Sequence, residues 1–69
     1  MFSERLVELR KTRSLTQKQL ADAIDANVRT IQFYEAGRLP EPEILIKFAR
    51  FFQVSTDYLL GLTDNVERR

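Results

Sequence analysis

The sequence predicts an all-α domain built from five short helices joined by tight turns. Apolar residues recur with helical periodicity, several segments open with a residue that favours a helix N-cap, and only two Gly and two Pro occur among the 69 residues. A chain of this length forms one domain. It contains no Cys and no His, so neither a disulfide nor a Cys/His zinc site can stabilise it, and its 43% apolar content must pack compactly.

Apolar periodicity and capping residues place the five helices along the chain. The expected helices cover about residues 2–12, 17–23, 28–35, 42–52 and 56–60. The first is indicated by Phe2, Leu6 and Leu9, which recur at i, i+4 and i+7 and mark one helix face. The second follows Thr16, which forms a capping-box pattern with Gln19 three residues later.

The remaining three helices each begin at a recognisable start signal. Asn27 is a good N-cap for the third helix, and Gly37 suits a left-handed residue at its end. Pro42 fits the first position of the fourth helix, with Glu41 before it as the cap. Ser55 caps the short last helix.

The expected domain covers residues 1–62, and residues 63–69 are expected to form a polar, frayed tail. Without His or Cys the chain lacks the commonest general base and the thiol nucleophile, and we expect no enzyme. Glu41 and Glu43 form a close acidic pair, but two positions apart at a helix start they point in different directions.

Other classes of protein are excluded by the same counts. Two glycines cannot build a Gly-rich phosphate loop, and no apolar run is long enough to span a membrane. The first residues also lack the basic start and apolar stretch of a secretory signal. We therefore expect a cytoplasmic protein with no cofactor, no metal, no membrane contact and no small-molecule ligand.

Residues 17–35 carry the strongest indication of function. Two short helices are joined here by a turn too tight for an antiparallel hairpin, so their axes must cross steeply, and Ala21 is small where they approach. Apolar residues hold the pair together at Leu20, Ile24, Ala26, Ile31 and Tyr34. This is the spacing of a helix-turn-helix, whose second helix can enter the major groove of DNA.

Several segments, each weak alone, are specific in their order and spacing. They are residues 5–10, 15–21, 30–38, Pro40 and 54–61. With them, over about residues 4 to 63, the chain resembles the lambda-repressor-like (Cro/C1-type) helix-turn-helix family. That resemblance implies a compact five-helix domain that binds double-stranded DNA sequence-specifically and regulates transcription, most readily as a repressor. Many members carry a further C-terminal domain, so the chain is either a small Cro-like regulator or a fragment of a larger repressor.

The sequence departs from the family's usual residues at two places. Relatives usually carry Gly in the turn where Asp25 stands, and we expect the turn to survive, because Asp tolerates the left-handed conformation better than most residues. In the reading helix, Val28 and Phe33 stand where relatives often have polar or basic residues. These two side chains make the preferred DNA sequence hard to infer.

The resemblance assigns base contacts to the outward face of the helix over residues 28–35. The candidates are Val28, Arg29, Gln32 and Phe33. Arg29 can donate two hydrogen bonds to guanine, Gln32 can bond adenine, and the two apolar side chains can pack on thymine methyl groups. The alternatives are that Arg29 and Gln32 are ordinary solvated residues and that Phe33 contacts protein.

Phosphate contacts and one ion pair complete the expected site. The phosphate candidates are Gln17, Asn27, Thr30 and Arg38, with Lys18 and Arg13 as weaker ones. Capping or exposure to solvent is the alternative for Gln17 and Asn27. Members of the family often pair an Arg of the first helix with an acid at the end of the third, which implies an ion pair between Arg10 and Glu35; the alternative for Arg10 is a phosphate contact.

The charge distribution favours DNA as the partner. Residues 10–38 hold six basic and three acidic side chains, whereas residues 39–67 hold two basic and five acidic ones. A formal net charge of only +1 implies few phosphate contacts and weak monomer binding, and so a homodimer on a palindromic operator. Apolar candidates for self-association are Ile44, Ile46, Phe51, Leu60, Leu62 and Val66. The alternative function is a protein-interaction or antitoxin-type helix-turn-helix module, which Val28 and Phe33 favour.

Overall fold

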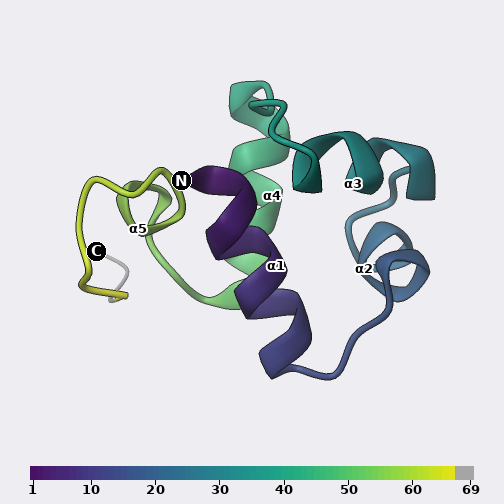
Figure 1. Cartoon of the computed structure of the whole chain (residues 1–69), viewed down its shortest axis with the longest axis horizontal. Coiled ribbons are helices and arrows are strands. Elements are labelled where there is room, and N and C mark those ends of the chain that lie inside the picture. Colours follow the sequence, from purple (N-terminus) through teal and green to yellow (C-terminus); the bar gives the residue numbers. More distant parts are fainter. Residues whose placement is uncertain (67–69) are drawn as a thin grey trace.

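The computed structural model describes residues 1–66 and contains five helices in this part of the chain. They are α1 (Phe2–Thr12), α2 (Gln17–Ala23), α3 (Val28–Glu35), α4 (Pro42–Phe52) and α5 (Thr56–Leu59). The all-α prediction is confirmed, and only the end of α5 differs, because Leu60 is its C-cap rather than its last helical residue. Figure 1 shows α2 and α3 at one end of the molecule, α5 at the other, and α1 and α4 between them.

Three of the four predicted N-caps form side-chain hydrogen bonds, whereas Glu41 stands at the N-cap of α4 as expected but makes no side-chain cap bond. The hydroxyl of Thr16 accepts from the Gln19 backbone N–H at 3.0 Å, and the Gln19 side chain accepts from the Thr16 N–H at 2.8 Å. The side-chain oxygen of Asn27 accepts from the Arg29 N–H at 2.8 Å. Ser55 caps α5 in the same way. Each cap satisfies an N–H group that the first turn of a helix leaves without a backbone partner.

Left-handed residues turn the chain between helices. Asp25 has φ 59°, so the turn between α2 and α3 forms without glycine, as expected. Gly37 has φ 123° just after α3. Ser14 and Gln53 are also left-handed, with φ 57° and 58°, and neither residue type predicts this conformation.

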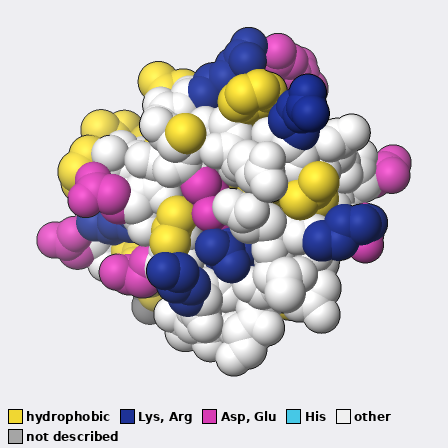
Figure 2. Space-filling model, turned by 45° about the vertical axis from the view of Figure 1, so that its right-hand side comes forward, with side chains coloured by type: hydrophobic (Ala, Val, Ile, Leu, Met, Phe, Trp, Pro, Cys, Tyr) yellow, Lys and Arg dark blue, Asp and Glu magenta, His cyan; other side chains and the backbone are white. Residues whose placement is uncertain are grey.

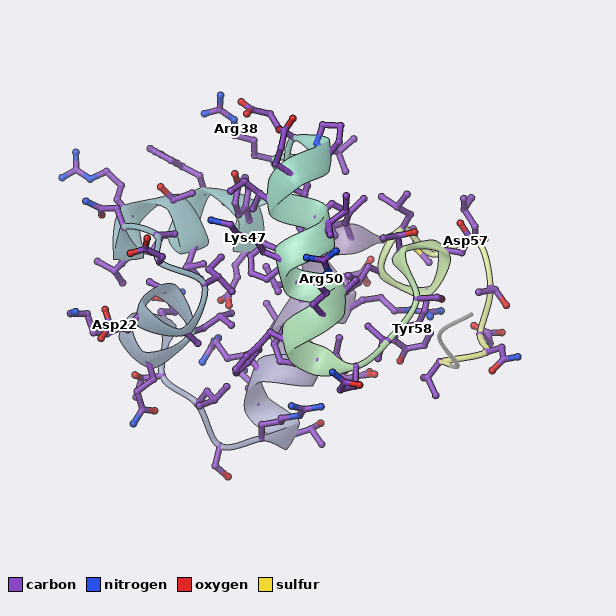
Figure 3. The ribbon with its side chains drawn as sticks, turned by 180° about the vertical axis from the view of Figure 1, so that it is seen from behind. Asp22, Arg38, Lys47, Arg50, Asp57 and Tyr58 are labelled. Carbon is purple, nitrogen blue, oxygen red and sulfur yellow. The ribbon has the colours of Figure 1, made fainter. Side chains whose placement is uncertain are left out.

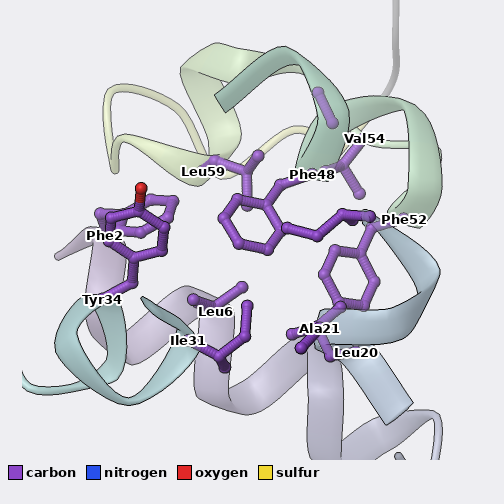
Figure 4. Close-up of a cluster of buried hydrophobic side chains, with 12 residues drawn as sticks. Phe2, Leu6, Leu20, Ala21, Ile31, Tyr34, Phe48, Phe52, Val54 and Leu59 are labelled. Carbon is purple, nitrogen blue, oxygen red and sulfur yellow. The ribbon is translucent and has the colours of Figure 1, made fainter. Parts of the chain in front are cut away.

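The core is one cluster of buried apolar side chains contributed by all five helices (Figure 4). Its members are Phe2, Leu6, Leu20, Ala21, Ile24, Ile31, Tyr34, Phe48, Ala49, Phe52, Val54 and Leu59. The fully buried Phe48 ring of α4 lies 5.9 Å from the ring centres of both Phe2 and Tyr34. These aromatic contacts bind α1, α3 and α4 together and hold the outward face of α3 in place.

Arg13 and Lys47 satisfy carbonyl groups at helix ends. Arg13, one of the weaker phosphate candidates, donates to the last two carbonyls of α4, at Phe51 (3.3 Å) and Phe52 (2.6 Å). Lys47 projects from α4 toward the end of the molecule formed by α2 and α3 (Figure 3). It donates to the carbonyl of Ile24 at the end of α2, at 3.4 Å. A cation at a helix C-terminus also interacts favourably with the helix dipole.

Residues 63–66 fold back onto the domain, whereas we expected a frayed tail. Arg5 donates to the carbonyls of Tyr58 (3.1 Å) and Thr63 (2.9 Å) and to the Asp64 carboxylate (2.7 Å). The Val66 carbonyl accepts from the Ser55 N–H at 3.2 Å. The part of the expected tail at residues 67–69 lies outside the described residues.

Candidate nucleic-acid interface

Helix α3 has one buried face and one exposed face. Ile31 and Tyr34 point into the core, and the opposite side exposes Arg29, Gln32, Phe33 and Ala36, spaced as i, i+3, i+4 and i+7. The exposed stripe therefore follows one side of the helix from its first turn to its end.

Helix α2 packs against α3 and crosses it at a steep angle. Figure 1 shows α2 nearly end-on while α3 lies across the view. Leu20 and Ala21 are fully buried, and the Ala21 carbonyl accepts from the Ala26 N–H at 2.8 Å, which closes the turn between the helices. The small Ala21 side chain allows the close crossing that the sequence predicted. The arrangement is a helix-turn-helix.

The structure brings three of the four base-contact candidates onto this exposed stripe. Arg29, Gln32 and Phe33 are exposed, and Phe33 retains 50% of its accessible surface. Val28 is partly buried and packs against the core at the first turn of α3. Only part of the Val28 side chain can therefore contact another molecule.

The expected ion pair between Arg10 and Glu35 is present, and it is bidentate. Arg10 Nε lies 2.6 Å from Glu35 Oε2, and Arg10 Nη2 lies 3.1 Å from Glu35 Oε1. Arg10 Nη1 also donates to the Leu15 carbonyl at 2.8 Å. The two side chains are 13% and 9% exposed. This bidentate ion pair ties the end of α3 to α1.

Gln17 extends this ion pair to the exposed stripe. Its amide Nε2 donates to Glu35 Oε1 at 3.0 Å, and its Oε1 accepts from Gln32 Nε2 at 3.4 Å. The family resemblance implied a phosphate contact for Gln17, and the sequence did not predict these bonds. Periodicity relates residues within one helix, whereas Gln17 and Gln32 meet only because α2 crosses α3.

The other phosphate candidates lie around α3. Lys18 pairs with Asp22 at 2.8 Å on the exposed surface of α2. The oxygen of Asn27 serves as the cap of α3, which leaves its amide N–H groups available. Arg38 is exposed in the loop before α4 and, within residues 1–66, forms no salt bridge.

A pocket lies between α3 and the start of α4. It is lined by Thr30, Phe33, Tyr34, Arg38, Leu39 and Glu41. Leu39 is 67% exposed beside it. Figure 2, turned to bring this end of the molecule forward, shows separate Lys and Arg side chains with apolar ones between them. The face combines isolated cations with apolar surface rather than forming one basic patch.

The structure gives half of the basic residues in 10–38 a partner within the protein. Of the six basic residues in 10–38, Arg10 and Arg13 bond to protein groups and Lys18 is paired with Asp22. Those left without a salt bridge in the described part of the chain are Lys11, Arg29 and Arg38. This agrees with the small number of phosphate contacts inferred from the net charge.

Within residues 1–66 the structure offers neither a metal-binding cluster nor a membrane-spanning helix. No group of three or more His, Cys, Asp or Glu side chains is placed to hold a metal ion. None of the helices there combines the length and the apolar character needed to cross a bilayer.

Comparison with known proteins gives a family match and several relatives. Residues 6–59 match the helix-turn-helix family model. The transcriptional regulators YobD and ImmR of Bacillus subtilis, both named as of helix-turn-helix type, are 42% and 36% identical over 100% and 99% of this chain. The cryptic phage CTXphi transcriptional repressor RstR of Vibrio cholerae is 41% identical over 87% of it. The chain spans 66%, 54% and 54% of the lengths of these three relatives.

Proposed function

Since this chain belongs to the helix-turn-helix family, as its lambda-repressor-like (Cro/C1-type) sequence segments predicted, we propose that it binds double-stranded DNA sequence-specifically and regulates transcription. The family also agrees with the prediction that the domain is not an enzyme. A DNA-binding regulator works where the DNA is, so the proposed location is the cytoplasm.

The exposed stripe of α3 is the observation that carries this proposal. An α-helix fits the major groove, and α3 offers Arg29, Gln32 and Phe33 on one side while Ile31 and Tyr34 anchor the other. In this role Arg29 donates to guanine, Gln32 bonds an adenine or cytosine edge, and Phe33 packs on a thymine methyl group. The exposed part of Val28 adds an apolar contact at the start of the helix.

Phosphate contacts on both sides of α3 would hold it in the groove. Lys18, Asn27, Thr30 and Arg38 supply donors there, and the side-chain amide of Gln17 has a second hydrogen beside the one that it gives to Glu35. Because few of these groups are cations, one domain alone binds weakly.

A homodimer on a palindromic operator is the arrangement we propose for strong binding. Two copies related by a dyad present their α3 helices to successive major-groove faces about 34 Å apart. Of the six apolar candidates for self-association, Ile46, Leu62 and Val66 are exposed. Bound in this way, residues 1–62 would cover an operator and act as a repressor, the role printed in the name of RstR.

The proposal is tested by selecting bound duplexes from a random pool with the wild-type chain and with Arg29→Ala. We expect a two-fold symmetric motif, a strong dependence on salt, and loss of preference at one base pair of each half-site in the variant. The discrimination lost corresponds to about 1–3 kcal/mol. Lys11→Ala serves as the control, since Lys11 is an exposed cation outside the base-contact candidates and its removal should leave the base preference unchanged.

The alternative of a protein-interaction module draws support from the apolar surface next to α3. Phe33 and Leu39 are both large and exposed, and neighbouring exposed apolar side chains can mark a surface that binds another protein. If the folded domain binds no duplex even in dilute buffer, the DNA proposal is contradicted and this alternative is favoured. A sequence-selective complex that dissociates in salt would exclude a purely protein-binding role.

A further inference from the structure

We propose that two copies of this chain pair through the exposed side of α4, with the two α4 helices antiparallel. This inference rests on the proposed function, which calls for a homodimer, and it adds which surface holds the two copies together. The surface, called the α4 face below, consists of Glu43, Ile46, Lys47 and Arg50.

The α4 face is continuous and open to a second molecule. Its four residues are spaced as i, i+3, i+4 and i+7, so they share one side of the helix, and all four are exposed. Phe48, Ala49 and Phe52, on the opposite side, are buried in the core. Figure 3 shows α4 with none of the other described helices in front of it and with Arg50 lying across it. A second copy can therefore approach along the whole face.

Opposite charges stand at the two ends of the α4 face without a partner. Glu43 and Lys47 have the order and spacing that favour a salt bridge within one helix. Lys47 instead turns toward α2 and donates to the Ile24 carbonyl at 3.4 Å. Within residues 1–66 neither Glu43 nor Arg50 forms a salt bridge. The face thus keeps a free acid at one end and a free base at the other.

A two-fold axis makes this face complementary to itself. Glu43 and Arg50 lie seven positions apart, about 10 Å along the helix. An axis through their midpoint reverses the second helix, so each Glu43 meets Arg50 of the other copy and two ion pairs form together. Ile46, 44% exposed, lies beside the midpoint and packs on its own counterpart. The two Lys47 side chains avoid each other because each is directed to Ile24.

The other exposed apolar candidates lack this complementarity. Leu62 and Val66 lie at the α5 end, where the Leu62 N–H donates to the Asp57 carbonyl at 2.9 Å. Asp57 and Asp64 are exposed there, whereas Arg5 is only 15% exposed and is already bonded to Asp64. Two copies meeting at this end would bring acids together without a free base among the described residues. The charges therefore favour α4 over the α5 end.

The test reverses the two charges one at a time and then mixes the variants. Glu43→Arg and Arg50→Glu each replace two attractive contacts of the dimer by repulsive ones. Each should weaken self-association about tenfold, measured by sedimentation equilibrium at low salt. Mixed in equal amounts, the two variants should form a heterodimer at least as readily as the wild type forms its homodimer. A doubly basic face then meets a doubly acidic one, a result that requires positions 43 and 50 to face each other.

Further variants supply a rescue and a matched control. A chain carrying both Glu43→Arg and Arg50→Glu should regain homodimerisation, because the two ends have only exchanged charges. Ile46→Ser should weaken association, whereas Leu62→Ser, at a residue that is 74% exposed at the α5 end, should leave it unchanged. Glu43 lies in the first turn of α4, where an acid favours the helix. If Glu43→Arg does not fold, Arg50→Glu and Ile46→Ser still carry the test.

The outcomes separate this inference from the proposed function. A wild-type chain that stays monomeric overturns the inference, and so does a dimer that is indifferent to the charges at 43 and 50 or is dissociated by Leu62→Ser. If such a chain still selects a two-fold DNA motif, the proposed function stands. A dimer that follows the charge reversals but selects no DNA sequence supports the pairing through α4 and contradicts the proposed function.

Discussion

Two arginines of α1 make similar bonds at opposite ends of the molecule. Arg10 bonds to a backbone carbonyl and to Glu35 at the end of α3, next to the candidate DNA-binding face. Arg5 bonds to two carbonyls and to Asp64 beyond α5. The arginines are almost equally buried, at 13% and 15% exposed, but Glu35 is 9% exposed and Asp64 is 99% exposed.

The difference between the carboxylates decides what each arginine contributes. If Arg10 is removed, Glu35 remains as a charge that is buried and poorly compensated, which is strongly destabilising. If Arg5 is removed, Asp64 is already in water and needs no partner. Arg10 thus holds α3 against α1 through a buried carboxylate. Arg5 instead holds the residues beyond α5 mainly through carbonyl groups and the ring of Tyr58, whose centre lies 4.1 Å from the Arg5 guanidinium carbon.

The largest effect should come from breaking the buried pair. Arg10→Ala is expected to lower the free energy of unfolding by about 3 kcal/mol, measured by denaturant titration at neutral pH. It should also weaken specific DNA binding, because the end of α3 loses its tie to α1. An Arg10→Ala domain as stable as wild type would remove the structural role that we give this pair.

Arg5→Ala should have a smaller effect. It removes two hydrogen bonds to carbonyls and the contact with Tyr58, which together are worth about 1–2 kcal/mol. Amide exchange should become faster at Ser55, whose N–H bonds to the Val66 carbonyl, while the amides of α3 stay protected. Equal loss of protection at both ends would show that the two regions open together and would end the distinction between them.

Asp64→Asn should have the smallest effect of the series. The carboxylate is almost fully exposed, so we expect no measurable change in unfolding free energy. Glu35→Gln is the matched change at the other end and should lower stability by about 2 kcal/mol, because a charged hydrogen bond is lost in a buried place. Similar changes in unfolding free energy for the two substitutions would mean that burial of the carboxylate does not explain why the two arginines contribute differently to stability.

Much of the candidate site was predictable because its parts are local or belong to a known family. The outward direction of Arg29, Gln32 and Phe33 follows from the phase of α3 relative to Ile31 and Tyr34. The pair between Arg10 and Glu35 was expected only from the family resemblance, since 25 residues separate its members. Sequence periodicity has no means of relating two such distant side chains.

Local chemistry in the sequence determined the helices and their starts. A cap such as that of Thr16 on Gln19 spans three residues and forms as soon as that stretch of chain becomes helical. The tertiary structure decided which distant groups the arginines and Gln17 meet. Arg5 reaches a carbonyl 58 residues away, and Gln17 meets Gln32 only where two helices cross. Such partners depend on how the apolar faces pack, and packing is a property of the whole chain rather than of any one segment.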